Sequence, residues 1–123
     1  MQLLLQIFIG LIALQHIYIL WLEMFAWENK GKKVFKGALA PELFKPTKTM
    51  AANQGLYNGF LAAGLIWSLF INDLLWQQNV ALFFLSCVAI AGIYGAFTAS
   101  RKIFFVQAMP ALMAIVILFT NQF

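Results

Sequence analysis

The sequence has few charged side chains and only one cysteine. Charged residues make up 10% of the 123 residues, whereas 63% of the residues are apolar. This composition excludes an ordinary soluble domain, which needs far more polar surface. The lone cysteine, Cys87, excludes an internal disulfide and is typical of a small buried hydrophobic residue. The N-terminus lacks the basic start and the cleavage site of a signal peptide, so we expect its apolar run to be a retained helix.

Basic residues are absent from every long apolar run and from one of the three gaps between the runs. The gap around Asn72 and Asp73 contains no Lys or Arg, and all eight basic residues lie in the other two gaps. Because cationic loops stay on the cytoplasmic face during membrane insertion, this distribution predicts one orientation. The net charge of +4 then indicates contact with anionic headgroups of the lipid bilayer and no nucleic-acid partner. The basic residues are Lys30, Lys32, Lys33, Lys36, Lys45 and Lys48 in the first gap and Arg101 and Lys102 in the third.

Four apolar windows are each long enough to cross a hydrocarbon core of about 30 Å, which takes roughly 20 helical residues. They cover about residues 3–26, 52–71, 80–99 and 103–121, which leaves no room for a soluble domain. The sequence therefore predicts an all-α protein, an integral membrane four-helix bundle that forms a single domain over residues 1–123. Because the basic loops are expected in the cytoplasm, both the N-terminus and the C-terminus are expected outside.

Small residues recur every four positions in two of the predicted helices. Such stripes let another helix approach closely, so we expect the second and third helices to pair tightly through them. Pro110 should bend the fourth helix, with neighbouring helices satisfying the carbonyl that it leaves free. The long loop 28–50 mixes apolar residues with lysines, which fits either an amphipathic segment along the headgroups or an ordinary solvated loop. The stripes are Gly55, Gly59 and Ala63 in the second helix, and Ala91, Gly95 and Ala99 beside Ala89, Gly92 and Ala96 in the third.

Polar residues inside the predicted spans gather in the half of the bilayer that faces the cytoplasm. His16 lies near the midplane and Glu23 about one turn inside the inner surface, and their spacing puts both on one face of the first helix. The other members of the set are Trp27 at the end of the first helix, Asn53, Gln54, Tyr57 and Asn58 in the second, Tyr94 and Thr98 in the third, and Gln107 in the fourth.

An ionisable side chain that faces lipid is unfavourable by several kcal/mol, so we expect these groups to face inward. This predicts a polar cavity open to the cytoplasm, with His16 and Glu23 as a catalytic acid–base pair and the other eight residues binding a ligand. The alternative is that the amides and His16 only join helices by hydrogen bonds and that Glu23 is neutralised at the interface. No metal site is predicted, because one histidine without a neighbouring cysteine is a poor ligand set, and no other cofactor is indicated.

The residues of the four predicted helices resemble those of a small bacterial membrane-protein family catalogued as domain of unknown function number thirteen-oh-four. The resemblance covers nearly the whole chain and implies a multi-pass protein of the bacterial plasma membrane without a settled activity. The segment Asn-Gln-Gly-x-Tyr-Asn is its most specific part. The matching residues are Gln15 and His16, Glu23, Met24 and Trp27, the segment 53–59, the segment 91–95, and Gln107, Ala108, Met109 and Pro110.

The sequence is compatible with three functions. The first is binding of a small amphipathic or lipid-like molecule, or acid–base chemistry on it, so whether the protein is an enzyme is left undecided. The second is a small proton-coupled transporter, which the chain length and the carboxylate of Glu23 favour. The fixed orientation opposes it, since the small four-helix multidrug exporters assemble antiparallel dimers. The third is a structural or accessory membrane subunit, and the small-residue surfaces also allow a homodimer.

Overall fold

The computed structural model describes residues 1–120, and within this range the chain is all-α, as predicted. There are five α-helices in these residues, four of them long and one of a single turn. Two π-helical turns and one 3-10 turn complete the secondary structure. The elements are α1 Leu3–Phe25, η1 Trp27–Gly31, α2 Lys32–Val34, η2 Pro41–Leu43, α3 Lys48–Leu69, α4 Leu74–Thr98, η3 Phe104–Ala108 and α5 Met109–Thr120.

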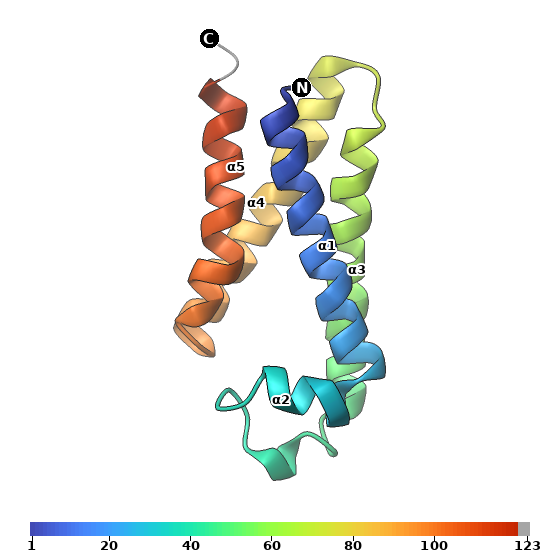
Figure 1. Ribbon diagram of the computed structural model, residues 1–123, viewed down its shortest axis with the longest axis vertical. Coiled ribbons are helices and arrows are strands. Elements are labelled where there is room, and N and C mark those ends of the chain that lie inside the picture. Colours follow the sequence, from blue (N-terminus) through green and yellow to red (C-terminus); the bar gives the residue numbers. More distant parts are fainter. Residues whose placement is uncertain (121–123) are drawn as a thin grey trace.

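The four long helices lie side by side along the long axis of the molecule (Figure 1). The N-terminus, the end of α5 and the turn between α3 and α4 lie at one end. The segment that contains α2 lies at the other end, which is also the end toward which the α4–η3 turn points. All eight basic residues belong to these two connections, 30–48 and 101–102, so the positive charge is collected at one end of the molecule.

Two of the helices, α1 and α4, are long and apolar enough to cross a membrane. The stretch Phe104–Thr120 is a shorter apolar helix. The length of α3 is similar to that of α1, but Asn53, Gln54 and Asn58 lower its hydropathy. The predicted end of the fourth helix, residue 121, lies outside the described residues.

The third predicted helix begins earlier than the sequence suggested. We expected it from about residue 80, but α4 begins at Leu74. The carboxylate of Asp73 accepts a hydrogen bond from the backbone N–H of Trp76 at 2.9 Å, and such a cap satisfies one of the free donors of the first turn. The second predicted helix also starts earlier, since α3 begins at Lys48.

The apolar core occupies the half of the molecule that holds the N-terminus and the end of α5, where all four long helices meet. Its side chains are mainly aliphatic or alanine, which lets the helices pack closely. Polar contacts between helices lie nearer the basic end, as described below. The core residues are Leu5, Ile9, Ile12 and Ala13 of α1, Leu65 of α3, Ala81, Leu85, Val88 and Ala89 of α4, and Ala111, Ala114 and Leu118 of α5.

The small-residue stripes do not pair with each other, so that prediction was wrong. A Cβ on Gly59 would lie 2.5 Å from Cδ1 of Leu20, so α1 fills the stripe of α3. A Cβ on Gly92 would lie 2.6 Å from the backbone nitrogen of Ala108, so η3 fills the stripe of α4. The helices α3 and α4 meet elsewhere, where the ring of Phe84 lies against Gly64. A stripe of small residues indicates that another helix packs closely against it. Which helix this is depends on the connecting segments, which place the helices relative to one another.

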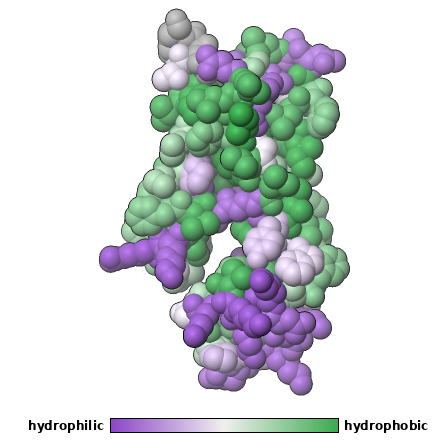
Figure 2. All heavy atoms as spheres, in the orientation of Figure 1, coloured by the Kyte–Doolittle hydropathy of each residue, from purple (hydrophilic) through white to green (hydrophobic). Residues whose placement is uncertain are grey.

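The helices form two pairs, α1 with α3 and α4 with α5. These two pairs diverge toward the basic end (Figure 1). In the space-filling view, hydrophobic atoms cover most of the upper body, and hydrophilic atoms gather at the lower end and in a central band (Figure 2). Below this band the surface is hollowed between the α4–η3 turn and the segment that follows α1 (Figure 2). The hollow lies at the end of the molecule where the sequence predicts a polar cavity.

Candidate functional site

Two ionisable side chains are buried on one face of α1. His16 is 0% exposed and Glu23 is 4% exposed. Seven residues make two helical turns, so the two side chains point in the same direction and lie about 10 Å apart along the helix axis. Each of them forms a hydrogen bond with an amide side chain from a different helix.

The carboxylate of Glu23 is paired with Asn58 of α3. The Asn58 amide donates to Oε2 of Glu23 at 2.9 Å and to the backbone carbonyl of Gln54 at 3.2 Å. This contact needs a close approach of the two helices. Gly55 allows it, because a Cβ at that position would lie 2.9 Å from the Cβ of Glu23 and 2.8 Å from Cγ of Met24.

His16 is held by its own helix on one side and by η3 on the other. Its Nδ1 lies 2.8 Å from the backbone carbonyl of Ile12. Because a carbonyl oxygen only accepts hydrogen bonds, Nδ1 carries the proton. In a neutral ring Nε2 is then an acceptor, and the side-chain amide of Gln107 donates to it across 3.3 Å.

Gln107 lies in a π-helical turn that α1 also contacts through Gln15. The Gln15 amide donates to the backbone carbonyl of Val106 at 2.8 Å. Pro110 has no N–H, so it cannot donate to this carbonyl four residues earlier as an ordinary helical residue would. A neighbouring helix therefore satisfies the carbonyl, as expected for a proline within a bundle. The irregular turn and the proline together bring Gln107 to His16.

Gln15 is a site residue that the sequence reasoning did not select. It appears among the residues that carry the family resemblance, but its contact with Val106 depends on how α1 packs against η3. One signal was available: an amide in the apolar first helix, beside His16, in a chain whose fourth helix contains a proline. A proline frees a known carbonyl, and an amide on a neighbouring helix is a suitable donor for it.

Five predicted site residues are not joined to either pair. Within residues 1–120, no hydrogen bond links their side chains to His16 or Glu23, and all five are exposed. The hydroxyl of Thr98 donates to the backbone carbonyl of Tyr94 on its own helix, at 2.8 Å. Whether these residues bind a ligand stays a prediction. The five are Asn53, Gln54, Tyr57, Tyr94 and Thr98.

Trp27 lies in the segment after α1 and organises it. Its indole N–H donates to the hydroxyl of Thr47 at 3.1 Å. Its ring packs against Phe44, with centroids 4.8 Å apart, and against Phe35 at 5.5 Å. Phe44 is thereby buried, so Trp27 fixes the segment that connects α1 to α3, at the basic end of the molecule.

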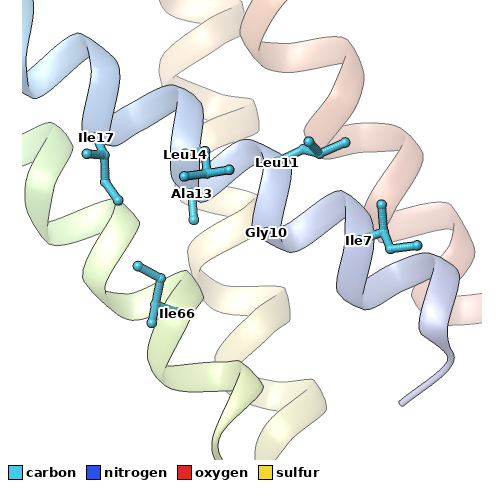
Figure 3. Close-up of a pocket in the computed structure, with 7 residues that line it drawn as sticks. All are labelled: Ile7, Gly10, Leu11, Ala13, Leu14, Ile17 and Ile66. Atoms are coloured by element: carbon cyan, nitrogen blue, oxygen red, sulfur yellow. The ribbon is translucent and has the colours of Figure 1, made fainter.

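A separate surface groove lies between α1 and α3 in the other half of the molecule. It has a volume of about 360 Å³, and Figure 3 shows that only apolar residues line it. Gly10 leaves space there, since a Cβ at this position would meet no atom within 4 Å. The groove offers no hydrogen-bonding side chain to orient a ligand, so we do not assign a site to it. For metals, no group of three or more His, Cys, Asp or Glu side chains is found among residues 1–120.

Comparison with known proteins gives a family but no activity. A family model described as "Protein of unknown function (DUF1304)" matches residues 10–119. The chain is 31% identical over 107 residues to the uncharacterized protein YpaA of Lactococcus lactis subsp. lactis, covering 86% of this chain and 88% of that protein. No solved structure shows significant similarity to the chain. With the match covering most of its length, the chain belongs to the DUF1304 family, as the residues of its four long helices indicated.

Proposed function

We propose that the protein crosses the plasma membrane four times, with both termini outside the cytoplasm. The length and apolar character of α1 and α4 support two crossings. α3 packs against α1 in the opposite direction, and η3 with α5 packs against α4. If α1 and α4 span the bilayer, α3 and α5 lie at the same depth and span it as well. The basic residues at one end of the molecule then face the cytoplasm.

We further propose that the protein binds a small amphipathic or lipid-like molecule from the cytoplasmic side. One observation carries this proposal: two buried ionisable side chains on one face of α1, each paired with an amide from another helix. Ionisable groups at membrane depth are unfavourable and usually mark a functional site. The hollow beside the α4–η3 turn offers a way in from the basic end (Figure 2).

In this proposal the polar head of the ligand meets the Glu23–Asn58 pair, which lies closer to the basic end than His16 does. Asn58 keeps its amide oxygen free to accept a further hydrogen bond, since it contacts Glu23 and Gln54 through its nitrogen. His16 and Gln107 close the deeper end of the face, where α1 meets η3. The apolar part of the ligand lies against the surrounding aliphatic and aromatic side chains.

The geometry favours binding over concerted acid–base chemistry. A general acid and a general base must both reach the reacting group, within about 3 Å or through one water. His16 and Glu23 lie two turns apart, and each already has an amide partner. A single small reacting group does not reach both, whereas an elongated molecule with two polar groups does.

Native mass spectrometry tests this proposal. The full-length protein, purified in detergent with a bacterial lipid extract, should retain a bound molecule. Glu23→Gln and Asn58→Ala should lose it, because they change the pair that holds the polar head. Ser68→Ala is the matched control, since Ser68 is also buried in α3 but donates only to Leu65 of its own helix.

Three results would reject binding at this pair. In the first, the wild-type protein retains no molecule, and in the second, Asn58→Ala retains it as the wild type does. The third is substrate uptake driven by a pH gradient and dependent on Glu23, measured in vesicles, which would favour a proton-coupled transporter instead. Purification with one stoichiometric protein partner, together with full function of Glu23→Gln, would favour an accessory subunit.

A further inference from the structure

The segment between α1 and α3 forms a cavity that is open to the surface and distinct from the polar pairs of α1. It has a volume of about 380 Å³ and is lined by Lys32, Lys36, Phe44 and the residues 37–41. Sites for small molecules in proteins usually measure about 300–1,000 Å³, so this cavity is large enough for one. It lies at the basic end of the molecule, in the segment after α1 (Figure 1).

The backbone around the cavity is fixed by local contacts. Gly37 has φ of +88°, a left-handed conformation that suits glycine and that other residues rarely adopt. The turn at Gly37 brings Lys36 beside Leu39, and these two residues form an isolated β-bridge. The floor is Phe44, which is 1% exposed and packs against the ring of Trp27. The cavity is therefore part of a folded segment.

The lining combines positive charge with apolar walls. Lys32 and Lys36, which each carry an ammonium group, line the cavity together with the apolar residues Leu39, Pro41 and Phe44. The segment 28–48 contains six lysines and two glutamates. One of these, Glu28, forms an ion pair with Lys48 at 3.5 Å, and neither glutamate lines the cavity. An anion with an attached apolar part matches this lining better than a small soluble anion does.

We propose that this cavity binds the phosphodiester headgroup of an anionic phospholipid in the cytoplasmic leaflet. Lys32 and Lys36 pair with the headgroup phosphate, and Leu39, Pro41 and Phe44 contact the start of the acyl chains. The inference rests on the proposed membrane orientation but is independent of the ligand at Glu23 and Asn58. Anionic lipid would then anchor the segment between α1 and α3 against the bilayer surface.

Lipid-binding measurements by native mass spectrometry on the full-length protein in detergent test this site. The probes are phosphatidylglycerol and phosphatidylcholine with identical acyl chains, which differ in net charge. We expect tighter binding of phosphatidylglycerol by the wild type. Lys32→Gln/Lys36→Gln should weaken that binding by about thirtyfold, the effect of two near-surface cations. Lys30→Gln/Lys33→Gln is the matched control: it removes the same charge from the same segment, outside the lining.

Several outcomes would overturn the proposal. Equal losses in the two double variants would show diffuse attraction to the whole basic segment. Equal binding of the two lipids would exclude recognition of the anionic headgroup. Displacement of the lipid by an excess of inorganic phosphate would identify a site for a soluble phosphate. Asn58→Ala should bind phosphatidylglycerol as the wild type does, so failure at this cavity and failure at the Glu23 site are distinguishable.

Discussion

The side-chain amide of Gln15 donates a hydrogen bond to the backbone carbonyl of Val106 at 2.8 Å. The first and fourth long helices are thus joined at the carbonyl that Pro110 leaves without its usual donor. The next residue of α1, His16, contacts the next residue of η3, Gln107. These neighbouring contacts fix where α1 and η3 meet. They therefore also fix how far the hollow between the α1–α3 pair and the α4–α5 pair extends from the basic end.

Replacing Gln15 by leucine should destabilise the protein. The carbonyl of Val106 then loses its side-chain donor, and in the proposed membrane position no water replaces it, so we expect a loss of about 1–3 kcal/mol. The measurement is the free energy of unfolding in detergent. In a Pro110→Ala background the effect of Gln15→Leu should shrink, because the new N–H at residue 110 can donate to the same carbonyl. A double-mutant cycle with no coupling would contradict the assignment.

Replacing Asn58 by alanine should also lower the free energy of unfolding. Glu23 is left buried without its amide partner, which costs about 1–3 kcal/mol. A second variant, Glu23→Leu/Asn58→Ala, should recover most of the loss, because removing both polar partners leaves no unpaired group. Equal stability of Asn58→Ala and the wild type would mean that this contact contributes nothing to folding.

Two glycines should respond to alanine in opposite ways. Gly92→Ala places its Cβ 2.6 Å from the backbone nitrogen of Ala108, so α4 and η3 must move apart. We expect a loss of roughly 1–3 kcal/mol from this overpacking. Gly10→Ala meets no atom within 4 Å, so it should gain roughly 0.5–1 kcal/mol of helix stability. Thermal unfolding of both variants in detergent tests the packing, and a stable Gly92→Ala would contradict it.

The proposed orientation can be measured by labelling single cysteines in intact cells. In a Cys87→Ala background, a cysteine at Asn72, in the turn between α3 and α4, should react with a membrane-impermeant maleimide. A cysteine at Lys33 should react only after the cells are opened, because its loop faces the cytoplasm. Both positions are exposed, so a lack of reaction reflects the membrane side. The reverse pattern would invert the topology and move the polar pairs to the outer half of the bilayer.

The sequence was most informative where a local property decides the structure. The apolar runs predicted an all-α chain, and the spacing of His16 and Glu23 correctly put them on one face of a helix. It was less informative about partners. The amides of the second and the fourth predicted helices were all suitable partners for Glu23, and only the packing of Gly55 against α1 selects Asn58. The early start of α4 was readable in principle, since Asp73 is a common capping residue.

By itself, the sequence determined the helical class, the family, the collection of basic residues in two connections and the set of polar residues from which a site can be built. These follow from composition and periodicity, which act along one helix at a time. The tertiary structure decided which helix fills each glycine stripe, which amide pairs with which ionisable group, and that Gln15 compensates for Pro110. Those choices depend on the relative positions of α1, α3 and η3, and positions between helices are set by packing and by the connecting segments rather than by any one helix.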